Sequence, residues 1–221
     1  RLSQCDAFPI ASCSVGWYTR GVFLMPLISC TFNNSPLAIE AILKLHFPRG
    51  TILDVTAGDG VFYKRVSRDV TMGDIRRLEH LDYVGDCSRV PFTHNTFDLV
   101  VFDPPFKVSH KRFGDRYGKT FNTETKVNRI YWTSIPELFR VARRGVIVKI
   151  SDGSDGHGTH MRHIWVVNWI KALTGLELYD WVMVVRPNDK GIQRPGTRQR
   201  YFRRNVSMFL IWKFITKEPF A

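Results

Sequence analysis

Hydrophobic and polar residues follow two different periods along residues 36–214. In LAIEAILKLHF (37–47) the apolar residues recur every three or four positions, which predicts a helix. Ser35 is expected to cap this helix, with Pro36 at its first position. Further helices are predicted over residues 61–68, 131–143 and 161–173.

Apolar runs bounded by turn residues predict the strands. They cover residues 51–55, 70–74, 83–85, 97–102, 146–150, 176–185 and 206–214. Strands and helices alternate from 36 to 150, which is typical of a doubly wound α/β sheet with mostly parallel strands. No helical pattern separates the last two strands, so we expect an antiparallel C-terminal hairpin. The sequence thus predicts a mostly parallel, seven-stranded sheet within one domain over residues 31–221, preceded by an N-terminal arm over residues 1–30.

The charge balance adds an expectation about partners. The chain has 32 Lys and Arg against 20 Asp and Glu, a formal net charge of +12 in 221 residues. Such an excess favours a polyanionic partner, with nucleic acid first and an anionic membrane surface second, although a solvated basic surface is the simpler alternative. No apolar run approaches the ~20 residues that span a bilayer, and no membrane partner is expected.

The cysteines and histidines do not indicate a metal site. The four cysteines, at positions 5, 13, 30 and 87, form no CxxC pair, which favours a reducing, cytoplasmic environment without disulfides. Leu-Ile-Ser-Cys, ending at Cys30, is similar to a lipoprotein cleavage site, but the preceding apolar segment is short and contains Pro26. His157, His160 and His163 lack a recognisable set of companion ligands, so we expect no bound metal.

Candidate chemistry begins at a glycine turn. LDVTAGDG (53–60) joins a predicted strand to a predicted helix, and Gly58 and Gly60 would allow the backbone to approach a ligand closely. A tight turn without a ligand is the alternative. Asp54, Asp74 and Asp86 each end one of three successive predicted strands, where ligands bind in open α/β sheets.

The most distinctive motif is DPPF, residues 103–106, directly after the buried strand 97–102. Two prolines stop a strand effectively, so a simple turn is one reading. The other reading is a rigid pair of acceptors, the Asp103 carboxylate and the Pro104 carbonyl. That pair would hold an amino group while Phe106 stacks on its ring.

The order LDVTAGDG, GD (73–74), GDCSRVPF (85–92) and FDLVVFDPPF (97–106) resembles the S-adenosylmethionine-dependent amino-methyltransferases, whose motif is [DNS]PP[YFW]. The resemblance covers about residues 31–214 and is greatest to the DNA N6-adenine enzymes. It implies a Rossmann-like class I methyltransferase fold, S-adenosylmethionine as cofactor, and methyl transfer to an exocyclic base amine. Val55-Thr56 replace the Pro-Phe usual in many DNA enzymes, which weakens the preference for DNA over RNA.

The resemblance also implies roles for individual residues. The clamp on the target amine would be Asp103, Pro104, Pro105 and Phe106. The cofactor-binding residues would be Asp54, Thr56, Gly58 and Gly60 in the turn, Asp74 for the ribose, and Asp86 with Cys87 for the adenine. TFNNSP (31–36) matches loosely a short element that touches the cofactor carboxylate.

Two basic segments with aromatic residues are the predicted nucleic-acid contacts. They contribute Lys107, Lys111, Arg112, Arg116, Arg194, Arg198, Arg200 and Arg203. The chain has no room for a large recognition domain, so specificity would come from short loops, the shape of the substrate or a partner protein.

Three alternatives to a DNA substrate remain open. The same chemistry could act on RNA or on a protein glutamine, and the fold could serve as an inactive nucleic-acid-binding module. The charge of +12 disfavours the glutamine, and intact Gly58 and Asp103 disfavour the inactive module.

Overall fold

The structure is a computed structural model that describes residues 28–106, 123–154, 158–186 and 205–214. The helices are α1 (Ser35–His46), the 3-10 helix η1 (Val61–Tyr63), α2 (Glu124–Val141) and α3 (Arg162–Thr174). The strands are β1 (Thr31–Phe32), β2 (Ile52–Asp54), β3 (Val70–Asp74), β4 (Tyr83–Val84), β5 (Phe97–Phe102), β6 (Ala142–Ile150), β7 (Gly153–Ser154), β8 (Thr159–His160), β9 (Asp180–Val185) and β10 (Val206–Lys213). No described helix is long and apolar enough to cross a bilayer.

The main sheet has the order β1-β9-β10-β6-β5-β2-β3-β4. Strands β4, β3, β2, β5 and β6 are mutually parallel, while β10 runs antiparallel to both β6 and β9. The predicted Rossmann-like, mostly parallel sheet with a C-terminal antiparallel hairpin is therefore confirmed. The sheet has eight strands rather than seven, because β1 adds a two-residue edge strand beside β9.

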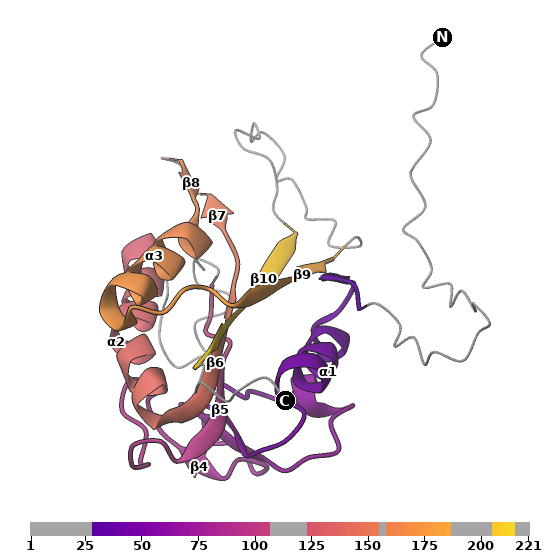
Figure 1. Cartoon of the computed structure of the whole chain (residues 1–221). Coiled ribbons are helices and arrows are strands. Elements are labelled where there is room, and N and C mark those ends of the chain that lie inside the picture. Colours follow the sequence, from indigo (N-terminus) through magenta and orange to yellow (C-terminus); the bar gives the residue numbers. More distant parts are fainter. Residues whose placement is uncertain (1–27, 107–122, 155–157, 187–204, 215–221) are drawn as a thin grey trace, which may run out of the picture.

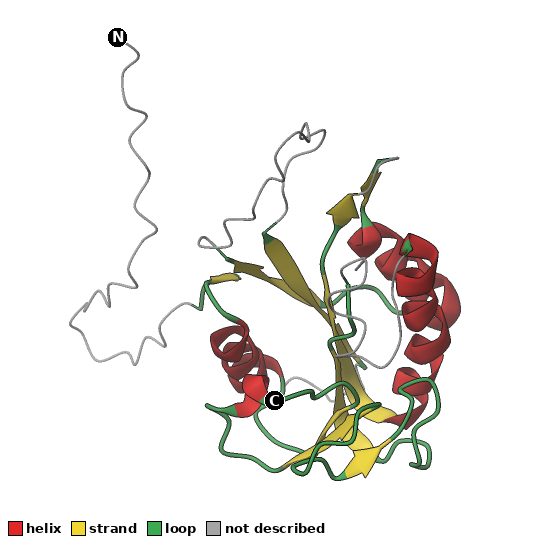
Figure 2. Ribbon diagram, turned by 180° about the vertical axis from the view of Figure 1, so that it is seen from behind, coloured by secondary structure: helices red, strands yellow, loops and turns green. Residues whose placement is uncertain are grey.

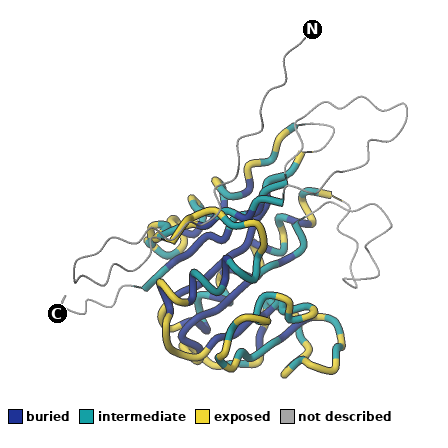
Figure 3. The backbone as a smooth tube through the Cα atoms, turned by 90° about the vertical axis from the view of Figure 1, so that its right-hand side faces the viewer, coloured by how far each residue is buried: buried dark blue, intermediate teal, exposed yellow. Residues whose placement is uncertain are grey.

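Helices cover both faces of the sheet, with α2 and α3 on one side and α1 on the other (Figure 1). Each side has its own apolar core. Val127, Ile135 and Val166 lie in the core beneath α2 and α3, whereas Ile39 and Ile42 of α1 lie in the other. Buried segments run through the middle of the molecule (Figure 3), and β2 is buried along its whole length. All six residues of β5 are buried, which explains its nearly continuous apolar sequence.

The structure corrects several predicted boundaries. The helix predicted over 61–68 is only the short η1, because the segment is rich in poor helix formers and Tyr63 bonds inward to Asp54. Asn34, rather than Ser35, caps α1 by accepting a hydrogen bond from the Leu37 amide. Helix α2 begins at Glu124, seven residues before its predicted start.

Alternation of strand and helix also holds only in part. Within the described residues no α-helix lies between β2 and β5, where loops and η1 make the connections (Figure 2). The edge of the sheet at β3 and β4 is therefore bordered largely by loops. This arrangement leaves the carboxyl ends of these strands accessible to a ligand.

Candidate active site

A pocket of about 830 Å³ lies where the order of strands reverses between β2 and β5. Such a reversal places a crevice outside the carboxyl ends of the strands, the usual ligand site of open α/β sheets. The walls come from the turns after β2, β3, β4 and β5 and from one side of α2. The residues of the four turns that line it are Val55–Asp59, Asp74–Arg76, Gly85–Ser88 and Asp103–Pro105.

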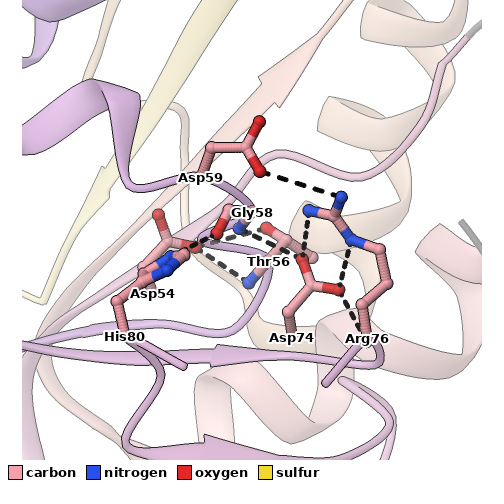
Figure 4. Close-up of polar contacts among 7 residues, drawn as sticks. All are labelled: Asp54, Thr56, Gly58, Asp59, Asp74, Arg76 and His80. Atoms are coloured by element: carbon pink, nitrogen blue, oxygen red, sulfur yellow. Dashed lines mark hydrogen bonds and ion pairs between the residues drawn. The ribbon is translucent and has the colours of Figure 1, made fainter. Parts of the chain in front are cut away.

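The glycine turn lines this pocket, and Figure 4 shows its polar contacts. Gly58 and Gly60 have φ angles of 57° and 65°, a region that favours glycine. A Cβ atom at Gly58 would also lie 3.1 Å from Nη2 of Arg76. Both positions therefore have a backbone conformation that favours glycine. Of the two, only Gly58 lines the pocket.

Asp54 lies beneath the turn rather than in the pocket. Its Oδ1 accepts hydrogen bonds from the amide of Thr56 at 2.8 Å and from the Thr56 hydroxyl at 3.3 Å. Its Oδ2 accepts one from the Tyr63 hydroxyl at 2.7 Å. Burial raises the pKa of the Asp54 carboxyl from 3.8 to about 7. Asp54 therefore braces the turn from below.

Asp74 connects the turn to β3. Its Oδ2 accepts the amide of Gly58 at 3.1 Å, and its Oδ1 accepts the amide of Arg76 at 2.9 Å. The Arg76 guanidinium also bonds Asp74, at 3.2 Å from Nε to Oδ1, and its Nη1 lies 3.9 Å from Asp59 (Figure 4). A ligand hydroxyl on Asp74 would therefore share this carboxylate with Arg76.

Asp86 and Cys87 form the wall after β4. Asp86 accepts hydrogen bonds from the amide and hydroxyl of Ser88, at 3.0 and 2.8 Å. The thiol of Cys87 lies 3.2 Å from the hydroxyl of Ser134 on α2, so this contact joins the two walls. Thr56, Gly58, Asp74, Asp86 and Cys87 thus line one pocket.

Asp103 faces the same pocket from the end of β5. Its amide donates a 2.7 Å hydrogen bond to the hydroxyl of Thr56, which fixes the start of the DPPF motif against the glycine turn. Oδ2 accepts a 2.9 Å hydrogen bond from Nζ of Lys149. Oδ1 is buried and has no hydrogen-bond partner among the described residues. An unpartnered buried acceptor at a pocket wall points to a ligand donor.

Pro104 and Pro105 line the pocket, but Phe106 does not. The Phe106 ring centroid lies 5.7 Å from Nζ of Lys149 and 5.9 Å from Cζ of Arg186. In this arrangement the ring is held by cations beside the pocket. The stacking role suggested for Phe106 is not realised in this geometry and stays a prediction.

Several cationic residues of the site were not predicted from the sequence. Lys149 lies in the buried strand β6, and the signal was a lysine within an otherwise apolar run, VIVKI. Lys126 and Arg129 of α2 are exposed, line the pocket, and make no ion pair with any described residue. Lys126 and Arg129 are three positions apart, so both lie on one side of the helix. The predicted helix began only at residue 131 and therefore did not include them.

Other predicted positions lie elsewhere. All eight basic residues predicted to contact nucleic acid, at positions 107–116 and 194–203, lie outside the described residues, as does His157. Thr31–Phe32 of the TFNNSP segment form β1 at the far edge of the sheet, and residues 31–36 do not line the pocket. His163 instead hydrogen-bonds Asp152 at 2.8 Å, and within the described ranges no three acidic, His or Cys side chains could hold a metal ion.

Comparison with known proteins gives only distant likenesses. No protein-family model matches the chain, and no curated protein matches it. Among solved structures, it is similar to Burkholderia thailandensis 1,6-didemethyltoxoflavin-N1-methyltransferase with bound 1,6-didemethyltoxoflavin and S-adenosylhomocysteine. This match has 14% identity and a TM-score of 0.49, and it covers 82% of this chain and 78% of that one.

Two further solved structures are similar at the same level. TrmN from Thermus thermophilus has 13% identity and a TM-score of 0.49, over 81% of this chain and 49% of that one. A SAM-dependent methyltransferase from Methanosarcina mazei has 12% identity and a TM-score of 0.46, over 78% and 96% of the two chains. Likenesses this weak do not assign the chain to a family.

Proposed function

We propose that this protein transfers a methyl group from S-adenosylmethionine to an exocyclic amino group of a nucleic-acid base, with adenine N6 in DNA the favoured target. One observation carries the proposal. Asp103 lines the pocket that also contains the glycine turn, and its Oδ1 is buried without a hydrogen-bond partner among the described residues. A hydrogen-bond acceptor for an amine is thus held next to a turn suited to a nucleotide-like cofactor.

The pocket residues fit S-adenosylmethionine. A volume of about 830 Å³ is within the range for small-molecule sites, which runs to about 1,000 Å³. Asp74 offers carboxylate oxygens at the end of β3, the usual place for a ribose ligand, and the wall after β4 offers Asp86 and Cys87 to the adenine. When bound, the cofactor supplies an electrophilic methyl group on a sulfonium.

Asp103 and Pro104 then orient the target amine. An exocyclic amine shares its lone pair with the ring and is a poor nucleophile. If Oδ1 of Asp103 accepts one N–H and the Pro104 carbonyl the other, the lone pair is directed toward the methyl group. The same acceptors stabilise the positive charge that develops on nitrogen. The N–C bond forms as the S–C bond breaks, and the excess proton leaves the nitrogen afterwards.

A nucleic-acid substrate is supported by charge at two levels. The chain carries +12 overall, and two cations that pair with no described residue, Lys126 and Arg129, lie on the pocket wall. Cations beside a base pocket can hold the phosphates that flank an extruded base. A protein glutamine as substrate would not require these charges.

The proposed reaction is tested with labelled S-adenosylmethionine. DNA and RNA are incubated separately with the protein and digested, and the nucleosides are identified by mass spectrometry. We expect labelled N6-methyladenosine from DNA, in its deoxy form. Label only in RNA would transfer the proposal to RNA, and label only in peptide would replace it with glutamine methylation. No heat with S-adenosylmethionine in calorimetry would instead favour an inactive binding module.

The two cations of α2 give a prediction about binding. A Lys126→Gln/Arg129→Gln double variant should bind nucleic acid more weakly, and the slope of log Kd against log salt concentration should fall by roughly 1.5–2. This is the change expected when two phosphate contacts are lost. Fluorescence anisotropy across a salt series measures it.

The matched control is Arg49→Gln/Arg144→Gln, which removes the same charge. Both arginines are exposed. Arg49 lies just before β2 and Arg144 near the start of β6, so both are at the amino ends of strands whose carboxyl ends face the pocket. An equal loss in both double variants would show that only net charge matters, and this would contradict a phosphate contact beside the pocket.

Asp74 gives a prediction about the cofactor. Asp74→Ala should weaken S-adenosylmethionine binding by roughly 1–3 kcal/mol, the usual cost of losing a charged hydrogen-bond partner. Titration calorimetry measures the affinity, with Asp82→Ala as control. Asp82 accepts a hydrogen bond from the amide of Met72, which lies on β3 as Asp74 does, but Asp82 itself does not line the pocket. Unchanged affinity in the Asp74 variant would mean that the ribose is held elsewhere.

A further inference from the structure

Lys149 is a buried lysine that the proposed chemistry has not yet used. It lies in β6 with only 5% of its surface exposed, and it does not line the pocket. Burying an ammonium is costly unless it is paired, so such a residue needs a compensating partner. Its partner is Asp103, with 2.9 Å between Nζ and Oδ2.

Three aromatic rings complete the surroundings of the ammonium. The centroid of Phe62 lies 4.7 Å from Nζ, and those of Phe106 and Phe209 each lie 5.7 Å away. The rings come from η1, the DPPF motif and β10, so they surround Lys149 from three separate parts of the fold. Contacts of this kind attract a cation and restrict its position.

The ion pair makes the two oxygens of the Asp103 carboxylate different. Lys149 occupies Oδ2, and the Thr56 hydroxyl accepts the Asp103 amide, so the residue is fixed from both ends. Only Oδ1 is left without a partner in the described structure. A charged hydrogen bond has strong geometric preferences, and it therefore sets the plane in which Oδ1 can accept.

We propose that Lys149 is the positioning residue of the amine clamp: it holds Oδ2 of Asp103 so that Oδ1 alone receives the amino hydrogen of the target base. This inference rests on the proposed function and adds to it the residue that orients the clamp.

The test replaces Lys149 with methionine, which suits the three rings and removes the charge. We expect kcat to fall by about 10²-fold, as for misplacement of a catalytic group, with the Kd of S-adenosylmethionine unchanged. Lys149→Arg keeps a cation at the same place and should recover part of kcat. Lys213→Met is the control, because Lys213 lies on β10 with its Nζ 5.4 Å from the ring of Tyr179, away from the pocket.

A binding measurement gives a readout without turnover. With S-adenosylhomocysteine present, the wild type should bind adenosine more tightly than purine riboside, which lacks the amino group, and Lys149→Met should lose this preference. If the wild type methylates nucleic acid but Lys149→Met keeps its kcat and preference, the inference is wrong. If the variant loses cofactor affinity or unfolds in step with activity, and Lys149→Arg recovers nothing, the role of Lys149 is structural and the inference is also wrong. If the wild type methylates no nucleic acid and shows no preference for adenosine, the proposed function itself fails.

Discussion

Replacing Asp103 with alanine is expected to reduce kcat for methyl transfer by at least about 10²–10³-fold, while S-adenosylmethionine binds within a few-fold of its wild-type affinity. The magnitude is that of removing one preorganised group that stabilises developing charge. The cofactor affinity should persist because the turn is braced separately, through Asp54 and Asp74. Single-turnover kinetics with labelled cofactor and titration calorimetry measure the two quantities.

Asp98→Asn is the matched control for this variant. Asp98 lies on the same strand, but it bonds Arg143 at 2.7 Å and the amide of Thr51 at 2.9 Å, at the amino end of β5. We expect this variant to lose some stability and to keep its kcat per folded molecule. Full turnover by the Asp103 variant would remove the clamp from the mechanism.

Replacing Arg162 with leucine is expected to lower the free energy of unfolding by about 3–5 kcal/mol, the usual cost of breaking a buried ion pair from one side. Arg162 is 1% exposed, and its guanidinium bonds both carboxylate oxygens of Glu124 at 2.6 Å and also the carbonyl of Ser151. It thereby connects the starts of α2 and α3 to the end of β6. Urea unfolding followed by circular dichroism measures the change.

Two further variants identify the cause of the loss. Arg140→Leu removes a partly exposed pair with Glu137 on α2 and should cost no more than about 1 kcal/mol. Adding Glu124→Gln to the Arg162 variant removes the unpaired carboxylate and should restore part of the stability. A loss at Arg162 no larger than that at Arg140 would contradict the structural role given to this pair.

The sheet was predictable because its signal is local. Strands β3 and β5 are found within the predicted limits, since a short apolar run is a sufficient description of a buried strand. The pocket was predictable for a related reason: the polar residues that follow parallel strands must gather at one edge of the sheet. Asp74 ends β3 and Asp103 follows β5, yet both line the pocket.

The partners of these residues were not predictable from local pattern. Lys149 and Asp103 are 46 positions apart, and Arg162 and Glu124 are 38 apart, so only the folded chain brings them together. Asp54 shows a different limit. Its position at the end of a strand suggested a ligand, whereas burial beside Tyr63 turns its carboxyl inward as a brace.

The hydroxyl of Thr56 joins two halves of the site that the sequence presents as separate motifs. It accepts the amide of Asp103 and lies within bonding distance of Asp54, so one side chain connects the ends of β2 and β5. The two loops are thus connected through this hydrogen bond and through the amide of Val55, which donates to the carbonyl of Val101 at 3.2 Å. In the proposed reaction, a cofactor bound at the glycine turn would therefore bear on the position of the clamp that holds the amine.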